Sequence, residues 1–254
     1  MNVLVCIKRV PSTGAKIVLT ETEQDIETRY LGFTISPHEE CAVEEAIRLV
    51  ESHGGAATVL TLGPEAATEQ LRYAMAQGID QAVHLETDGS DWDPMATARA
   101  IVEAIHVQQA AGVDFDLLLF GNEAADSGGY QVGIRVAHAL DLPCVTGIKA
   151  LEVKDGTAIA RREASGGWEI FEVPLPAAFS VKEGINLPRY PSLPGRLRAK
   201  KAQIRQIVPQ QWQGGPDKVK LKVPQEQSRG AEILGEGPQA APKIVEILKK
   251  VGVV

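Results

Sequence analysis

Short apolar stretches alternate with amphipathic stretches up to about Ile148, and no other sequence feature restricts the fold as strongly. Residues 3–7, 57–62, 81–85 and 116–120 have the length and composition of buried strands, and segments with helical periodicity lie between them. Buried strands joined by helices form a parallel sheet that helices cover on both faces. The sequence therefore predicts an α/β fold of this kind.

One helix has clear signals at both of its ends. Ser36, Pro37 and Glu39 have the spacing of an N-cap, a first-turn proline and the partner residue of a capping box. Apolar residues at positions 43, 46, 47 and 50 give this segment one apolar face. Gly54 is typical of a helix end. We therefore expect a helix that begins after Ser36.

Ligands of such folds bind beyond the carboxyl ends of the strands, where the strand order reverses. The candidate loops are residues 8–13, 63–65 and 121–132. Residues 121–133 (GNEAADSGGYQVG) join a buried strand to a helix, and their glycines allow an anion to approach the backbone closely. The loop lacks the GK[ST] ending of a Walker A motif and is not GxGxxG. Phosphate binding and an ordinary glycine-rich turn both fit it.

The pattern changes to hairpins after Ile148. Residues 151–153, 157–162 and 168–173 are short strand-like runs separated by glycine-containing turns, and residues 177–181 form another apolar strand. We expect antiparallel hairpins added to the parallel sheet.

Residues 182–201 (KEGINLPRYPSLPGRLRAKK) differ sharply from the rest of the chain. The net charge of the chain is -7, yet residues 184–216 contain no acidic side chain. Three prolines stiffen the stretch, and Tyr190 and Leu193 are apolar. Apolar anchors on a stiff loop beside basic residues are typical of a protein-docking surface. A solvated basic loop has the same composition.

Residues 207–237 are rich in Gln, Pro and Gly, so we expect an extended arm. Ala241 and Pro242 then begin a short amphipathic helix, which needs a surface to pack on. A partner subunit and the helix's own domain are the two alternatives for this surface. We divide the chain into an α/β domain at residues 1–206, with the hairpins and the docking stretch, and an arm at residues 207–254 that clasps a partner.

Several classes of function have no support in the sequence. Three widely spaced cysteines and five scattered histidines show no metal-ligand spacing, and no nucleophile, base and acid pattern occurs. We therefore expect no metal site and no catalytic residues. The carboxylate pairs Glu39–Glu40 and Glu44–Glu45 are predicted to be solvated surface charge.

The acidic balance argues against nucleic-acid binding. No apolar run approaches the roughly 20 residues that span a bilayer, so no membrane insertion is expected. The first strand begins almost at once and leaves no room for a targeting segment, which predicts the cytoplasm or a compartment reached after processing. We expect a cytoplasmic protein.

Four motifs resemble those of one protein family and together span most of the chain. They are VLVCIKRVP at residues 3–11, AVEEA at residues 42–46, REASGG at residues 162–167, and GINLPRYPSLP with AKK at residues 184–194 and 199–201. On these motifs the chain resembles the beta subunit of electron transfer flavoprotein. The last motif is long and specific.

This resemblance implies a Rossmann-like fold of the adenine nucleotide alpha-hydrolase type. It also implies an electron carrier without substrate turnover, paired in a heterodimer with an alpha subunit that holds most of the FAD. The beta subunit would bind AMP in a structural role. Electrons would pass from flavin dehydrogenases to a membrane quinone oxidoreductase.

The resemblance also assigns roles to individual residues. Leu193 matches the anchor that inserts into a dehydrogenase, and Glu163 matches a turn residue near the flavin across the subunit interface. Around Leu193, the docking surface would contain Tyr190, Arg196, Arg198, Lys200 and Lys201. The AMP contacts, mostly through backbone, would be Cys6, Ser36, Pro37, His38, Glu39, Leu62, Gly121, Asn122, Glu123, Ala124, Ala125, Asp126, Ser127, Gly128, Gly129, Tyr130, Gln131 and Val132.

Two departures from the family's patterns leave alternatives open. Members that bifurcate electrons place a second FAD in the beta subunit and share the QVG at residues 131–133. This chain has Asp126 at their first acidic position but Gly128 at their second, so we expect AMP, with a second FAD as the alternative. Ser12 and Thr13 stand where some members have an aromatic residue, so stacking on the flavin is not expected. A stand-alone adenine-nucleotide-binding module is a further interpretation.

Overall fold

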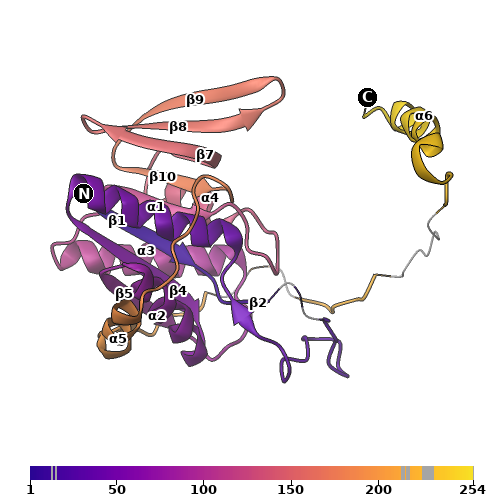
Figure 1. The fold of residues 1–254 in the computed structure, drawn as a ribbon. Helices are drawn as coiled ribbons and strands as arrows, with labels where there is room; N and C mark the ends of the chain where they lie inside the picture. The colour runs from indigo at the N-terminus through magenta and orange to yellow at the C-terminus, as the bar shows by residue number, and fades with distance from the viewer. Residues whose placement is uncertain (13, 15, 213–214, 216–217, 225–231, 254) are drawn as a thin grey trace.

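A nine-stranded sheet forms the body of the protein, with strand order β11-β5-β4-β1-β6-β10-β7-β8-β9 (Figure 1). All neighbours from β11 to β7 are parallel, and β8 and β9 continue the sheet antiparallel at one edge. This arrangement confirms the predicted α/β fold with hairpin additions. The structure, a computed structural model, describes all residues except 13, 15, 213–214, 216–217, 225–231 and 254. Thr13 and parts of the predicted arm therefore lie outside the described residues.

The parallel strands and their helices follow the predicted order closely. The strands are β1 (Asn2–Ile7), β4 (Ala56–Gly63), β5 (Gln81–Glu86), β6 (Leu117–Gly121), β10 (Ala177–Val181) and β11 (Arg205–Ile207). The helices of this region are α1 (Pro37–His53), η1 (Glu65–Ala67), α2 (Thr68–Gln77), α3 (Pro94–Ala110) and α4 (Val132–Ala139). The excursion between β1 and α1 contains a small antiparallel pair, β2 (Val10–Pro11) and β3 (Phe33–Thr34).

The strand order reverses beside β1. From β1 the chain steps outward through β4 to β5, and α3 then carries it back so that β6 pairs with the other side of β1. The loops that follow β1 and β6 are therefore neighbours at the carboxyl edge of the sheet. This is the position where open α/β sheets bind ligands.

Alternate residues of β1 face two separate cores, as the period of a strand requires. Val3 and Val5 face the core beneath α1 and α2, whereas Leu4 and Cys6 face the core beneath α3 and α4. Both faces of the central strands are thus covered, which explains why they are apolar almost without interruption.

The hairpin region begins with one long strand, β7 (Cys144–Lys154). Its first half pairs with β10, and its second half pairs with β8 (Thr157–Ala164), which in turn pairs with β9 (Gly167–Pro174). The sequence pattern predicts one strand around Val145 and a separate one at residues 151–153, and this separation was wrong. The register shifts between Ile148 and Ala150, next to Gly147 with a φ of 70°, so the strand is irregular without ending.

The docking stretch is an extended segment followed by a helix. The segment crosses α1, and α5 (Leu193–Lys201) then packs against α2 (Figure 1). Ser192 caps α5 by accepting the N–H of Gly195, and a proline occupies its first turn. The prediction of a single stiff loop was therefore wrong for residues 193–201.

The arm is fastened to the body before it reaches its terminal helix. Beyond β11, the ammonium of Lys218 lies within 3.0 Å of carboxylate oxygens of Asp25 and Asp91, and that of Lys220 lies 2.6 Å from Glu23. The arm's root is thus tied to the excursion that precedes α1 and to the loop after β5.

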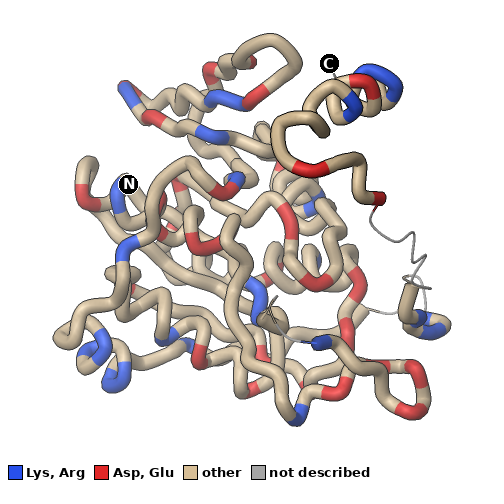
Figure 2. The backbone as a smooth tube through the Cα atoms, turned by 45° about the vertical axis from the view of Figure 1, so that its right-hand side comes forward, with Lys and Arg blue, Asp and Glu red and all other residues tan. Residues whose placement is uncertain are grey.

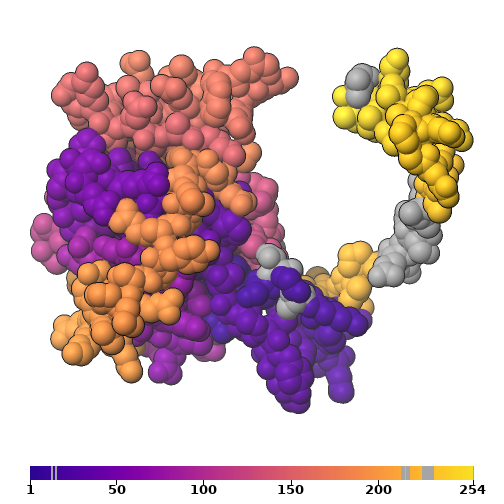
Figure 3. Space-filling view, viewed as in Figure 1, coloured from indigo at the N-terminus to yellow at the C-terminus, as the bar shows by residue number. Residues whose placement is uncertain are grey.

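The terminal helix α6 (Ala241–Val251) follows the short η2 (Gly237–Ala240) and stands apart from the body (Figures 1 and 3). It is amphipathic but has no buried residue, and Ile244, Val245, Ile247 and Val251 are exposed. None of the described helices combines the length and apolar character needed to cross a membrane.

Candidate functional site

Three segments converge at the carboxyl edge beside β1 and β6. The ammonium of Lys8, after β1, lies 2.6 Å from a carboxylate oxygen of Asp126, in the loop after β6. Nε2 of His38, in the first turn of α1, lies 3.4 Å from Glu123 of the same loop. The neighbouring Glu39 accepts the backbone N–H of Lys8 at 2.9 Å. The structure thus brings together the ends of β1 and β6, as the strand pattern predicts, and adds the start of α1, which only the family resemblance placed here.

Glu39 is the buried carboxyl group at the centre of this edge. It completes the predicted capping box, because it accepts the N–H of Ser36 at 2.9 Å while its own N–H donates to the Ser36 hydroxyl at 3.2 Å. Gly121 packs so closely that a Cβ there would lie 2.6 Å from Cγ of Glu39. Burial raises the pKa of Glu39 to about 8, although hydrogen bonds from Ser36 and Lys8 oppose the shift.

We predict that Glu39 makes stability depend on pH. Its pKa is about 8 in the folded chain and 4.5 for a free group, so between these values the folded chain holds a proton that the unfolded chain has released. The free energy of unfolding therefore falls as pH rises through this window, by at most about 1.4 kcal/mol per pH unit. Glu39→Gln should flatten this part of the profile. Urea unfolding at several pH values checks this, and identical profiles for the two proteins would contradict it.

The loop between β6 and α4 has a backbone suited to an anion. Gly128 and Tyr130 have φ values of 54° and 55°, and left-handed non-glycine residues gather at functional sites. No side-chain hydrogen bond caps α4 at Gln131, unlike α1, so the first N–H groups of α4 are available to a ligand. A helix N-terminus with such groups favours a phosphate. Lys8 and His38 supply cationic or donor groups beside the loop.

The other predicted ligand residues differ in their distance from this edge. The side chain of Cys6 faces the core under α3 and α4, where burial raises the pKa of its thiol, so only its backbone can serve a ligand. Leu62 lies near the end of β4, the neighbour of β1. Glu163 is exposed near the end of β8, opposite Trp168 of β9. Because β6, β10 and β7 separate β8 from β1, the structure does not place Glu163 beside the loops of β1 and β6.

The predicted docking residues gather on and beside α5. Tyr190 is 89% exposed, and Leu193, the first residue of α5, is 72% exposed. The basic residues Arg196, Arg198, Lys200 and Lys201 are exposed on the same helix, and Figure 2 shows blue turns gathered in this region at the lower left. The structure therefore presents apolar side chains beside positive charge, as a docking surface requires.

Leu197 belongs to the same surface but was not predicted. It lies one helical turn after Leu193 and is 57% exposed. The available signal was the spacing of four between the two leucines, together with Ser192 and Pro194, which mark a helix start as Ser36 and Pro37 do. The signal was missed because the stretch was interpreted as a loop.

The backbone of α5 is held firmly against α2. Nη1 of Arg72 donates to the carbonyls of Ala199, Lys200 and Ala202 at 2.6, 3.3 and 3.3 Å. Gly195 allows α5 to approach α2 closely, because a Cβ there would collide with the carbonyl oxygen of Ala76. The exposed leucines are therefore presented from a fixed helix.

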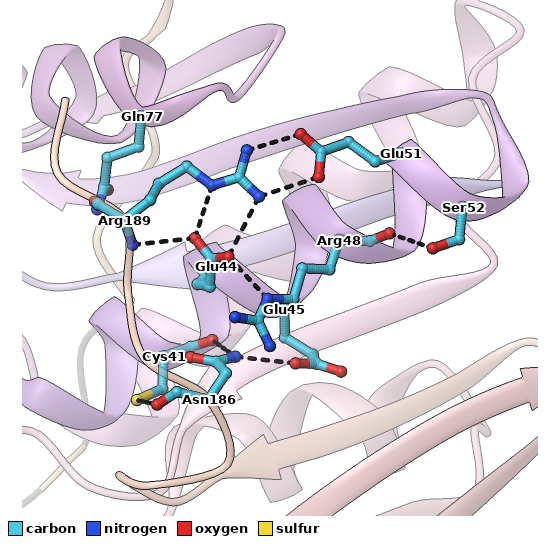
Figure 4. Close-up of polar contacts among 9 residues, drawn as sticks. All are labelled: Cys41, Glu44, Glu45, Arg48, Glu51, Ser52, Gln77, Asn186 and Arg189. Carbon is cyan, nitrogen blue, oxygen red and sulfur yellow. Dashed lines mark hydrogen bonds and ion pairs between the residues drawn. The ribbon is translucent and has the colours of Figure 1, made fainter. Parts of the chain in front are cut away.

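The carboxylate pairs on α1 are not solvated, which corrects the sequence-based prediction. Glu39, Glu44 and Glu45 are buried, and Glu40 is only partly exposed. The segment that leads to α5 covers Glu44 and Glu45 and donates hydrogen bonds to them (Figure 4). The pattern within one helix does not reveal a covering segment that is so distant in sequence.

Comparisons with known proteins identify a single family. A family model described as "Electron transfer flavoprotein domain" matches residues 25–211. The "Electron transfer flavoprotein subunit beta" of Bacillus subtilis is 36% identical over 98% of this chain and 98% of its own length. The protein of the same name from Syntrophomonas wolfei is 35% identical over 98% of this chain and 96% of its length. That of Dictyostelium discoideum is 28% identical over 98% of both.

Proposed function

Because the chain belongs to the electron transfer flavoprotein family as a beta subunit, we propose that it forms a heterodimer with an alpha subunit that holds most of the FAD. This heterodimer carries electrons from flavin dehydrogenases to a membrane quinone oxidoreductase. It acts in the cytoplasm. The chain turns over no substrate of its own.

The docking surface on α5 carries this proposal. Leu193 and Leu197 are large apolar side chains exposed on a basic helix whose backbone is fixed against α2, and Tyr190 is exposed just before this helix. Exposed apolar groups rimmed by charge mark protein interaction sites. A carrier that meets several redox partners needs a docking surface that is separate from its nucleotide site. The two are separate here, because α5 lies against α2, whereas Lys8 and Asp126 follow β1 and β6.

We further propose that the edge beside β1 and β6 binds AMP. The uncapped start of α4 and the loop glycines suit the phosphate, and Lys8 and His38 lie beside them. When bound, AMP would supply no redox chemistry, so its effect is to stabilise the loop that Glu123 and Asp126 already tie to the body.

Counting cofactors tests the nucleotide assignment. Purified heterodimer should contain one FAD, and denaturation should release one AMP. Two FAD molecules per heterodimer would contradict the AMP assignment and favour a second FAD in this subunit. If the chain purifies as a stable monomer that binds AMP and never associates with an FAD-binding subunit, it is instead a stand-alone nucleotide-binding module.

The arm at residues 207–254 supplies the clasp to the alpha subunit in this proposal. Its support is the apolar face of α6, which no described part of the body covers. A helix of this length is marginal in isolation, so a partner's surface would stabilise it.

A further inference from the structure

The segment that leads into α5 is held by side chains of α1 and α2. Residues 183–192 form neither helix nor strand. Nδ2 of Asn186 donates to the carbonyl of Cys41 at 3.0 Å and to the carboxylate of Glu45 at 2.8 Å. Three residues later, the backbone N–H of Arg189 donates to Glu44 at 3.1 Å. The path of this segment is therefore fixed by two buried carboxylates on α1.

The guanidinium of Arg189 adds a second layer of contacts (Figure 4). Its Nε and Nη2 donate to the two oxygens of Glu44 at 2.9 and 3.2 Å, and its Nη1 and Nη2 donate to those of Glu51 at 2.6 and 2.9 Å. Glu44 and Glu51 are two helical turns apart and share one face of α1. Gln77 of α2 donates to the Arg189 carbonyl at 2.9 Å. Arg189 is thus joined to both helices.

The charges in this cluster depend on one another. Only 3% of the Glu44 side chain is exposed, and burial alone would raise its pKa. Hydrogen bonds from Arg189 and Arg48 outweigh burial and hold the pKa of Glu44 below its ordinary value. Hydrogen bonds to Glu51 and then to Glu44 raise the pKa of Arg189. A bidentate pair of this kind fixes geometry as well as charge.

We propose that Arg189, Glu44 and Glu51, here called the Arg189 clamp, position the docking surface for its redox partner. The clamp ends one residue before Tyr190 and four before Leu193, so it sets where both side chains emerge. Because the segment has already lost its conformational freedom on folding, binding a partner costs less conformational entropy, which increases affinity. This inference rests on the proposed docking function. Arg189 is a positioning residue, since its side chain bonds within the chain.

Two matched arginine variants test the clamp. Arg189→Ala and Arg48→Ala each remove one arginine that contacts Glu44, but only Arg189 belongs to the segment at residues 183–192 that leads into α5. The heterodimer is assayed with a soluble flavin dehydrogenase that reduces the wild type. Arg189→Ala should raise KM for that dehydrogenase about tenfold with kcat nearly unchanged, and should speed amide exchange at residues 184–193. Arg48→Ala should change neither KM nor amide exchange. Arg189→Lys should have an intermediate effect, because lysine keeps the positive charge but cannot form the bidentate hydrogen bonds of the guanidinium.

Flavin content and the rate of reduction by dithionite should stay at wild-type values in every variant. If Arg189→Ala does not fold, Glu51→Gln replaces it, because Glu51 is exposed and its loss leaves no buried charge. A wild-type KM in the folded clamp variant overturns the proposal, as does an equal effect of Arg48→Ala. If Leu193→Ala leaves KM unchanged, the docking function itself fails. If Leu193→Ala raises KM and the clamp variant does not, only the clamp fails.

Discussion

Leu193→Ala should lower kcat/KM for reduction by a flavin dehydrogenase about thirtyfold. Leu193 is 72% exposed in the free chain, so most of its apolar surface is available for burial by a partner. Leucine to alanine removes three carbons, and their burial is worth about 2 kcal/mol, which corresponds to about thirtyfold. Leu197→Ala should have a smaller effect in the same direction. Stopped-flow reduction of the heterodimer's flavin, at several dehydrogenase concentrations, measures both.

Val107→Ala is the control for this experiment. Val107 is 42% exposed on α3 and belongs neither to the docking surface nor to the arm. It should leave the kinetics unchanged, and all three variants should keep wild-type flavin content. An unchanged kcat/KM for Leu193→Ala would show that α5 is not the surface that meets the dehydrogenase.

Deleting residues 232–254 should weaken the heterodimer at least a hundredfold while leaving the body folded. The apolar side chains of α6 contribute nothing to the body's core, because none of them is buried. Their burial against a partner is worth about 3 kcal/mol or more, which corresponds to a hundredfold or more in Kd. Sedimentation of mixed subunits measures the Kd, and circular dichroism measures the melting temperature of the truncated chain.

Two point variants refine this test. Ile244→Gln places an amide on the apolar face of α6, whereas Glu246→Gln places the same side chain on the opposite face. Only Ile244→Gln should raise the Kd. If the truncated chain binds the alpha subunit as tightly as the full chain does, the arm is not a clasp. A large drop in the melting temperature of the isolated body would instead show that α6 packs on its own domain.

Features encoded by neighbouring residues were predicted well from the sequence. Ser36, Pro37 and Glu39 specify a helix start through contacts within one turn, and the structure shows that capping box. The central strands were recognisable because burial on both faces makes them apolar throughout. The convergence of Lys8 and Asp126 also followed, because parallel strands place their carboxyl ends at one edge. His38 was expected at this edge only from the family resemblance, because it lies at a helix start and not at the end of a strand.

Features that depend on distant residues were predicted poorly. Glu44 and Glu45 have an ordinary surface pattern within α1, and only the arrival of Asn186 and Arg189 buries them. The three residues of β11 have no strand signal of their own and owe their conformation to the free edge of β5. The predicted role of Glu163 depends on a subunit interface that one chain does not contain, so it stays a prediction.

The fastening of the arm at Lys218 and Lys220 has a consequence for assembly. Because the root is tied to Asp25, Asp91 and Glu23, a chain that has captured a partner through α6 keeps the partner close to its own body. Contacts between the partner and the body then form within one complex. The effective concentration for these contacts is set by the short tether and lies in the millimolar range. The ion pairs at the root are largely exposed, so salt weakens them and lengthens the tether. Ionic strength would thus act on the proposed subunit capture through the root of the arm.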